Sequence, residues 1–258
     1  MIWDEKQLHW HLTTRRFGRQ FRYFEEIDST NRWLMQHPEA FTLSGGVAVA
    51  GHQINGRGRN SREWLDASGG ALLFSISLKL RDNQSARGFL SLIPAIALAR
   101  VLKKHNRELD VSLKWPNDVL IDHKKVAGIL AETTKHENDD VVIIGVGINV
   151  SAIPPQNFIW PATSIFEQTK WHPSREILLA ELLNEWEPLF DIYLDGDTQL
   201  LRDAWEKLGP PRGSTIKRVD GQHTVVGVFE GLGVQGQLVV KDSVGNLHDV
   251  FSGDVVPA

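Results

Sequence analysis

The 258-residue sequence contains no cysteine, which excludes disulfide bonds, thiolate metal sites and thiol nucleophiles. It also contains no segment that approaches the roughly 20 consecutive apolar residues of a membrane-spanning helix. The first residues, MIWDEKQLHWHL, carry charges where a secretory signal would be continuously apolar. We therefore expect a soluble, cytoplasmic protein that does not bind a membrane.

An excess of positive charge is absent as well, since 28 Lys and Arg residues oppose 32 Asp and Glu residues, a formal net charge of −4. General affinity for nucleic acid is therefore not expected, and DNA is not a predicted partner. The N-terminal region nevertheless has a basic run, which we interpret as a solvated edge of the protein. Its members are Arg15, Arg16, Arg19 and Arg22.

Three common catalytic motifs are missing: the P-loop G-x-x-x-x-G-K-[ST], the nucleophile elbow G-x-S-x-G and the zinc motif H-E-x-x-H. The segment GLGVQG at 231–236 matches the dinucleotide pattern G-x-G-x-x-G, which has to open a helix in order to hold pyrophosphate. Because this segment lies between strand-like stretches, it predicts a hairpin turn instead.

What is present is a mixture of strand-like and helix-like segments, typical of an α+β protein. Strands are predicted at 20–27, 45–53, 69–80, 111–115, 118–122, 125–134 and 141–150, and helices from 28–30, at 88–105 and at 175–194. After Leu208, Gly and Pro residues precede short strands at 214–219, 223–232, 236–242 and 248–253. We therefore predict two domains, residues 1–208 and a small β-barrel of residues 209–258.

The segment INGRGRNSREW at 54–64 places Arg57, Arg59 and Arg62 close together in an otherwise mildly acidic chain. Glycines such as Gly58 allow backbone N–H groups to approach an anion, and they permit left-handed torsions. Arginine offers a planar fork of donors suited to phosphate and carboxylate. The segment therefore predicts an anion-binding loop, and an exposed basic turn is the alternative.

The segment LKWPNDVLI at 113–121 brings Lys114, Asn117 and Asp118 to a proline turn between two apolar runs. Asn and Asp supply oxygen ligands of the kind that magnesium–phosphate sites use. A plain turn between two strands is the alternative, and it would be favoured if the segment stood alone.

Two later segments place small residues beside polar ones. In KKVAGIL, Lys125 precedes the pair Ala127–Gly128, which would allow a ligand or a neighbouring strand to come close. In GVGINV at 145–150, the glycines indicate close approach of another chain or a ligand, and Asn149 is the polar residue. The alternatives are a lysine at a surface strand end and tight core packing.

The order of these motifs resembles the biotin–protein ligases, enzymes that attach biotin to the carrier domains of carboxylases. The motifs are DSTN at 28–31, Q-x-x-GRGR-x-x-R-x-W at 53–64, KWPND at 114–118, K-V-A-G at 125–128 and G-x-GIN at 145–149. The resemblance runs from about Ile27 to Asn149 and extends to the C-terminal barrel. Ser61 departs from the pattern, because the family usually has glycine there.

The resemblance implies a mixed β-sheet flanked by helices, shared with lipoate ligases and class II aminoacyl-tRNA synthetases, and a C-terminal SH3-like β-barrel. It implies that biotin and Mg·ATP form biotinyl-5′-AMP and pyrophosphate, and that a lysine of a biotin carboxyl carrier protein then displaces AMP. Biotin, ATP and Mg²⁺ are the expected small molecules. Because only about 26 residues precede DSTN, too few for a helix-turn-helix domain, we expect a catalytic-only form. A homodimer is left open.

The resemblance also assigns roles to residues of this sequence. Biotin contacts are expected from Ser29, Thr30, Asn31, Gln53, Arg57, Gly58, Arg59, Lys125 and Gly128, with hydroxyl and amide groups pairing with the ureido ring. ATP and adenylate contacts are expected from Arg57, Arg59, Arg62, Trp64, Asn117, Lys125, Asn149 and Trp160. The expected catalytic residues are Lys125, Asp118, Arg57 and Arg59, and Asn117 is the expected magnesium contact.

Two other functions stay open: a lipoate or octanoate ligase on the same fold, and a non-catalytic biotin-binding module. Gln53 and the GRGR pattern count against the first of these functions. The presence of Lys125, Asp118 and the motif arginines counts against the second. Repulsion among the three arginines also predicts that the loop at 54–64 is mobile until an anionic ligand binds.

Overall fold

The computed structural model describes residues 3–41, 44–67, 69–80, 86–136, 139–153, 161–220 and 223–257. Its larger sheet has seven strands in the order β1-β2-β3-β7-β6-β5-β4. The pair β1–β2 is parallel and the other neighbours are antiparallel, so the sheet is mixed, as expected. The strands are β1 Phe21–Ile27, β2 Gly46–Gln53, β3 Ala71–Lys79, β4 Val111–Lys114, β5 Asp118–Ile121, β6 Lys124–His136 and β7 Asp139–Asn149.

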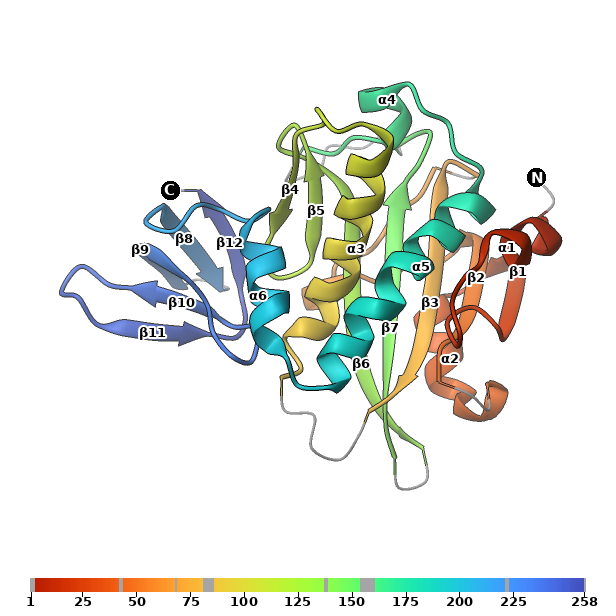
Figure 1. Ribbon diagram of the computed structural model, residues 1–258, viewed down its shortest axis with the longest axis horizontal. Helices are drawn as coiled ribbons and strands as arrows, with labels where there is room; N and C mark the ends of the chain where they lie inside the picture. The colour runs from red at the N-terminus through yellow and green to blue at the C-terminus, as the bar shows by residue number, and fades with distance from the viewer. Residues whose placement is uncertain are drawn as a thin grey trace.

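Helices α3 (Phe89–His105) and α5 (Arg175–Leu194) cover one face of this sheet, as Figure 1 shows, and α2 (Thr30–Gln36) packs on the other. The strands alternate to match, because successive side chains of a strand point to opposite faces. In β7, Val142, Ile144, Val146 and Ile148 join the core on the α3 and α5 side. Val141 and Ile143 pack toward α2, and the glycines of β7 continue that second face. The α2 side of the sheet is therefore partly apolar and partly bare of side chains.

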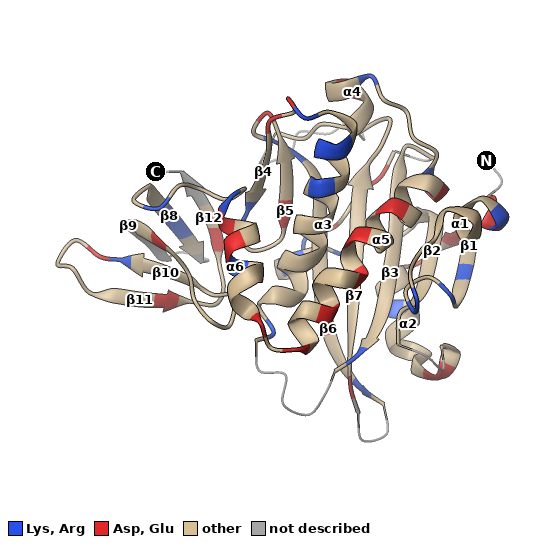
Figure 2. Ribbon diagram, viewed as in Figure 1, with Lys and Arg blue, Asp and Glu red and all other residues tan. Residues whose placement is uncertain are grey.

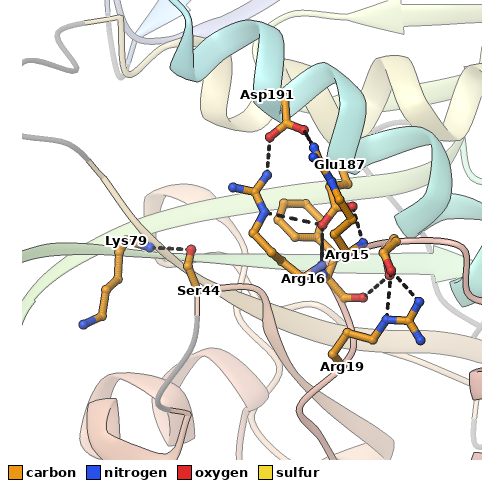
Figure 3. Close-up of polar contacts among 9 residues, drawn as sticks. Arg15, Arg16, Arg19, Ser44, Lys79, Glu187 and Asp191 are labelled. Atoms are coloured by element: carbon orange, nitrogen blue, oxygen red, sulfur yellow. Dashed lines mark hydrogen bonds and ion pairs between the residues drawn. The ribbon is translucent and has the colours of Figure 1, made fainter.

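The N-terminal segment, with helix α1 (Glu5–His11), lies against α5. Figure 2 shows acidic residues at several positions along α5, and two of them bind this segment. Arg15 and Arg16 both pair with Asp191, and the backbone N–H groups of residues 15–17 all donate to Glu187 (Figure 3). The predicted solvated edge fits Arg15, whose side chain is 79% exposed, whereas Arg16 is held between two carboxylates.

The smaller sheet has five antiparallel strands in the order β11-β10-β9-β8-β12 and lies at the left of Figure 1. Its strands are β8 Thr215–Asp220, β9 His223–Leu232, β10 Leu238–Lys241, β11 Leu247–Val250 and β12 Asp254–Pro257. The segment GLGVQG joins β9 to β10, with the Gly233 N–H donating to the Gln237 carbonyl, so the predicted hairpin is confirmed. The sheet is compatible with an SH3-like barrel, and the division after residue 208 stays a prediction.

Sequence periodicity missed three short helices and the last strand. The helices are α1, α4 (Ile165–Thr169) and α6 (Thr198–Glu206), and each begins at a side-chain cap: Asp4, Ser164 and Asp197 respectively. Helices of five to nine residues show too few turns for a clear apolar period. Among the described residues, no helix is both long and apolar enough to cross a membrane.

Candidate active site

A cavity of about 120 Å³ lies on the α2 side of the larger sheet, between β6, β7, the start of α2 and the segment 54–64. Thirteen of the fifteen predicted site residues line this cavity. They are Ser29, Thr30, Asn31, Gln53, Arg57, Gly58, Arg59, Arg62, Trp64, Asn117, Asp118, Lys125 and Gly128. The fold thus brings motifs that are far apart in the sequence to one place, while the role of each residue stays a prediction.

The start of α2 places hydroxyl and amide groups at one end of the cavity. Ser29 is the N-cap, and its hydroxyl oxygen accepts a hydrogen bond from the Arg32 N–H at 3.5 Å. The Thr30 N–H and hydroxyl lie 2.8 and 3.1 Å from Oε1 of Gln53, and its hydroxyl is 2.6 Å from that of Ser75. Oε1 of Gln53 thus accepts from Thr30, while its Nε2 lies near Gly56, 3.4 Å from where a Cβ there would stand.

Asn31 connects α2 to the sheet. Its Nδ2 donates to the Leu130 carbonyl at 3.3 Å and to Glu132 at 2.8 Å, and its Oδ1 accepts from the Ser75 hydroxyl at 2.6 Å. Gly145 makes room for this side chain, since a Cβ there would lie 2.3 Å from Oδ1 of Asn31. Ser75 is fully buried and was not predicted, although a serine within the apolar run ALLFSISLK was a signal for it.

Residues 56–64 form a hairpin over the cavity, with a short 3₁₀ turn at Arg59–Ser61. The Gly58 N–H donates to the Arg62 carbonyl at 2.7 Å, and the Trp64 N–H donates to the Gly56 carbonyl at 2.9 Å. The two arms lie so close that a Cβ at Gly56 would be 2.3 Å from the Trp64 carbonyl oxygen. Glycine at position 56 is therefore required by the packing of backbone on backbone.

The torsions of this hairpin differ from expectation. Gly58 is extended, with φ −118°, and Asn60 is the residue in the left-handed region, with φ 54°. The prediction that the glycines supply left-handed torsions is therefore wrong, because Asn, which tolerates this region better than most residues, takes that role. The side chain of Ser61, where the sequence departs from the family pattern, lies outside the described part of the structure.

Each arginine of the hairpin is matched by a carboxylate from a distant segment. Nη2 of Arg57 lies 2.9 Å from Oε1 of Glu132 on β6, and Arg62 pairs with Asp254 on β12. Nη1 of Arg59 lies 3.7 Å from the same Asp254 carboxylate. These pairs offset the repulsion among the guanidinium groups, and they bring the smaller sheet to the rim of the cavity. Neither carboxylate lies in a motif that would predict it, and mobility of the hairpin stays a prediction.

Trp64 lies on a floor made of glycine. A Cβ at Gly147 would be 2.4 Å from Cε2 of Trp64, and a Cβ at Gly128 would be 2.9 Å from its Cζ3. The ammonium of Lys125 is 5.5 Å from the centroid of the indole ring, within the range of a cation–π contact. The glycines of GVGINV therefore admit side chains from neighbouring segments and also form a wall of the cavity, and their contact with a ligand stays a prediction.

Asp118 and Lys125 form a charged end of the cavity, and Lys114 approaches Asp118 from outside the cavity lining. Oδ1 of Asp118 lies 2.6 Å from Nζ of Lys125, and its Oδ2 lies 3.7 Å from Nζ of Lys114. Burial lowers the pKa of Lys114, while the charges of Asp118 and Asp254 oppose this shift. Asn117 donates through Nδ2 to the Ile129 carbonyl at 2.7 Å, which fixes its amide beside Asp118.

Two predicted residues are not placed in the cavity. Asn149 is buried, and its Nδ2 donates to the Thr163 carbonyl at 3.0 Å, so its side chain joins β7 to the following segment. Trp160 lies outside the described residues. Its neighbour in the sequence, Pro161, accepts a hydrogen bond from the Lys125 N–H at 2.8 Å. Nucleotide contacts by Asn149 and Trp160 stay predictions.

A metal ion has little preformed support here. Among the described residues, no group of three His, Asp or Glu side chains could hold a metal. The Asp118 carboxylate is already paired with two ammonium groups, and the amide nitrogen of Asn117 is engaged. Such a site fits a Mg²⁺ ion that arrives with phosphates, because Mg²⁺ typically uses one or two protein oxygens together with substrate phosphates and water.

The cavity thus combines two chemistries. Neutral hydroxyl and amide groups from α2 and β2 suit a polar, uncharged ring, whereas the guanidinium and ammonium groups at the other end suit carboxylate and phosphate. Such an arrangement can bring an acid and a phosphate together and offset the negative charge that grows as they react.

Comparisons with known proteins identify the family of this chain. Residues 23–149 match the model of the biotin/lipoate A/B protein ligase family. The chain is 32% identical over 262 residues to the biotin--[acetyl-CoA-carboxylase] ligase of Mycobacterium tuberculosis, covering 98% of this chain and 95% of that protein. It is 30% identical over 217 residues to the bifunctional ligase/repressor BirA of Escherichia coli, covering 83% of this chain and 67% of that protein.

A solved structure gives the same result. The biotin protein ligase from Aquifex aeolicus in complex with biotin and ATP superposes with a TM-score of 0.74 at 27% identity, covering 92% of this chain and 98% of that one. The mixed sheet, its flanking helices and the smaller sheet therefore match a ligase fold. By its sequence and its fold, this chain belongs to the biotin/lipoate protein ligase family.

Proposed function

We propose that this protein is an ATP-dependent biotin–protein ligase, which forms biotinyl-5′-AMP and transfers biotin to a lysine of a biotin carboxyl carrier protein. The observation that supports this function best is the joining of a neutral hydroxyl and amide end to a cationic end in one cavity. Biotin has a complementary charge distribution, with a neutral ureido ring at one end and a carboxylate at the other. The ligases of M. tuberculosis and A. aeolicus support the same activity.

The neutral end binds the ureido ring in this proposal. Ser29, Thr30 and Gln53 supply the hydroxyl and amide groups, and Gly128 provides a floor for the ring system once Trp64 has moved off it. Asn31 contributes mainly by supporting the wall, because its amide is already bonded to Glu132 and Ser75. The hydroxyl and amide groups themselves need little reorganisation, since hydrogen bonds hold Thr30 and Gln53 in place before the ligand binds.

Adenylate formation depends on the cationic end. The biotin carboxylate attacks the α-phosphorus of Mg·ATP, a bond forms between oxygen and phosphorus, and pyrophosphate leaves. Arg57, Arg59 and Lys125 offset the growing negative charge, and Arg62 and Gly58 contact phosphate. Asn117 supplies an oxygen to the Mg²⁺ ion of Mg·ATP. Trp64 covers the nucleotide in this proposal, and the same role is proposed for Trp160. Asn149 is proposed as a further nucleotide contact.

Transfer to the carrier requires a deprotonated amine, whose unperturbed pKa is about 10.4. Asp118 accepts the proton from the incoming ammonium group in our proposal, and its Oδ1 already lies 2.6 Å from the ammonium of Lys125. The amine nitrogen then bonds to the acyl carbon, the carbon–oxygen bond to the phosphate breaks, and AMP leaves with the electron pair. The carrier lysine thus has to enter on the Asp118 side of the cavity.

The domain division and the cell location belong to this proposal as well. Residues 1–208 form the catalytic domain, residues 209–258 form the second domain, and the enzyme acts in the cytoplasm. Limited proteolysis that cuts near residue 208 and leaves two resistant fragments would support the division. A homodimer is left open, and sedimentation measurements with and without biotin would decide it.

The deciding experiment incubates the protein with radiolabelled biotin, Mg·ATP and a carboxylase carrier domain. Label on the carrier together with pyrophosphate release is the expected result. Binding of biotin without pyrophosphate release would favour the non-catalytic biotin-binding module. A rise in melting temperature with lipoate but not with biotin would favour the lipoate ligase instead.

A further inference from the structure

Asp118 is held by two ammonium groups that differ in their surroundings. Lys125 lies on β6, contacts Oδ1 at 2.6 Å and lines the cavity. Lys114 lies on β4, directly opposite Asp118 in the β4–β5 register, and contacts Oδ2 at 3.7 Å. Lys114 lines a second, mostly apolar cleft between β4 and the smaller sheet and not the cavity itself. Each carboxylate oxygen therefore has its own ammonium partner, and only Lys125 of the two lysines lines the cavity.

The charges around Lys114 come from four segments. Asp118 of β5 and Asp254 of β12 attract its ammonium, whereas Lys125 of β6 and Arg62 of the hairpin repel it. Its side chain is only 15% exposed, and burial lowers its pKa. A buried ammonium is unfavourable without nearby carboxylates, so the charges of Asp118 and Asp254 stabilise this lysine. One of these acids is the proposed proton acceptor and the other binds the arginine hairpin.

We propose that Lys114 is a positioning residue that keeps the Asp118 carboxylate oriented for the transfer step. This inference rests on the proposed function. When Lys125 turns its charge toward the phosphate of the adenylate, Asp118 loses part of its stronger contact. Lys114 does not line the cavity, so in this proposal it stays with Oδ2 and holds Oδ1 toward the incoming amine. Lys114 therefore acts through Asp118 and does not touch the reacting atoms.

Lys114→Met tests the inference, because methionine keeps an unbranched side chain, one atom shorter, and removes its charge. Carrier labelling from pre-made biotinyl-5′-AMP should fall about tenfold, a part of the roughly 10²–10⁴-fold that a positioned acid or base contributes. Pyrophosphate release with biotin and Mg·ATP should change less than about threefold, since Lys114 does not line the cavity. Lys114→Arg, which restores the charge, should recover most of the transfer rate.

A double-mutant cycle separates positioning from a purely structural role. In an Asp118→Asn background, which removes the proposed proton acceptor, Lys114→Met should have no further effect on transfer. Equal losses in both half-reactions, or the same loss of transfer with and without Asp118, would overturn the inference. Should Lys114→Met not fold, Lys114→Gln and Lys114→Arg carry the same comparison. Failure of the unaltered protein to form biotinyl-5′-AMP would refute the proposed function instead, so the two failures are distinct.

Discussion

Replacing Trp64 with alanine should speed the binding of biotin, because the indole lies where the proposed function places the biotin rings. The ring covers the floor formed by Gly128 and Gly147. The space left beside it is about 120 Å³, smaller than the roughly 300–1,000 Å³ of typical small-molecule sites. Biotin therefore reaches this floor only after the ring has moved.

The expected size of the effect follows from the contacts that the ring gives up. Its contact with the Lys125 ammonium, at 5.5 Å from the ring centroid, is worth about 0.5–2 kcal/mol. The indole N–H is buried without a hydrogen-bond partner among the described residues, which offsets part of the gain from packing. A displacement free energy of about 1–2 kcal/mol corresponds to about 5- to 30-fold faster association of biotin with Trp64→Ala.

Stopped-flow measurements of biotin association and dissociation test this prediction. Trp10→Ala is the matched control, because Trp10 is 87% exposed and its removal should leave both rates unchanged. An unchanged association rate with faster dissociation would show that Trp64 is only a wall of the site, and would refute the reasoning. The variant should also lose about 1–3 kcal/mol of unfolding free energy, less than a fully buried Trp, since Trp64 is half-buried.

Three further predictions concern a catalytic residue, a buried hydroxyl and a buried carboxylate. Lys125→Ala should lower adenylate formation by about 10²–10³-fold and transfer from pre-made adenylate by less; equal losses in pyrophosphate release and carrier labelling would contradict the assigned roles. Tyr193→Phe should raise the unfolding free energy, measured in urea, by about 1 kcal/mol, because the buried Tyr193 hydroxyl has no partner among the described residues. A fall of similar size in the unfolding free energy would contradict this. Burial raises the pKa of Glu187, but N–H donors from Arg15, Phe17 and Arg16 outweigh it, so the pKa falls below its ordinary value of 4.5. Its stabilising contribution is therefore present above pH 4.5 and lost as pH falls through the folded pKa; Glu187→Gln should flatten this loss in melting temperature, and parallel pH curves would refute it.

The strands of the larger sheet were predictable because each carries its own pattern. The run ALLFSISLKL and the run VVIIGVGINV are apolar enough to read as strands without knowledge of their neighbours. Cavity residues such as Gln53, Asp118 and Lys125 were found through the order of short motifs. A motif indicates which residues are candidates for the site, and the ends of the strands then bring these residues to one cavity.

The partners of these residues were not predictable in the same way. Glu132 and Asp254 pair with the arginine hairpin, yet 75 and 192 positions separate them from Arg57 and Arg62, and neither lies in a recognisable motif. An ion pair depends on where two segments meet, which local sequence does not encode. The role of Gly56 was missed for the same reason, because the close backbone that requires it belongs to the opposite arm of the hairpin.

Side chains of β7 point alternately to the two faces of the sheet, and this alternation determines what mutations along the strand should do. Ile144, Val146 and Ile148 face the interior, whereas Gly145 and Gly147 face Asn31 and Trp64. Saturation mutagenesis of β7 should therefore give two alternating phenotypes. Changes at the even positions should lower protein abundance, and changes at these two odd positions should abolish labelling while abundance is retained. Neighbouring residues of one strand thus serve different ends, one set stabilising the fold and the other shaping the cavity.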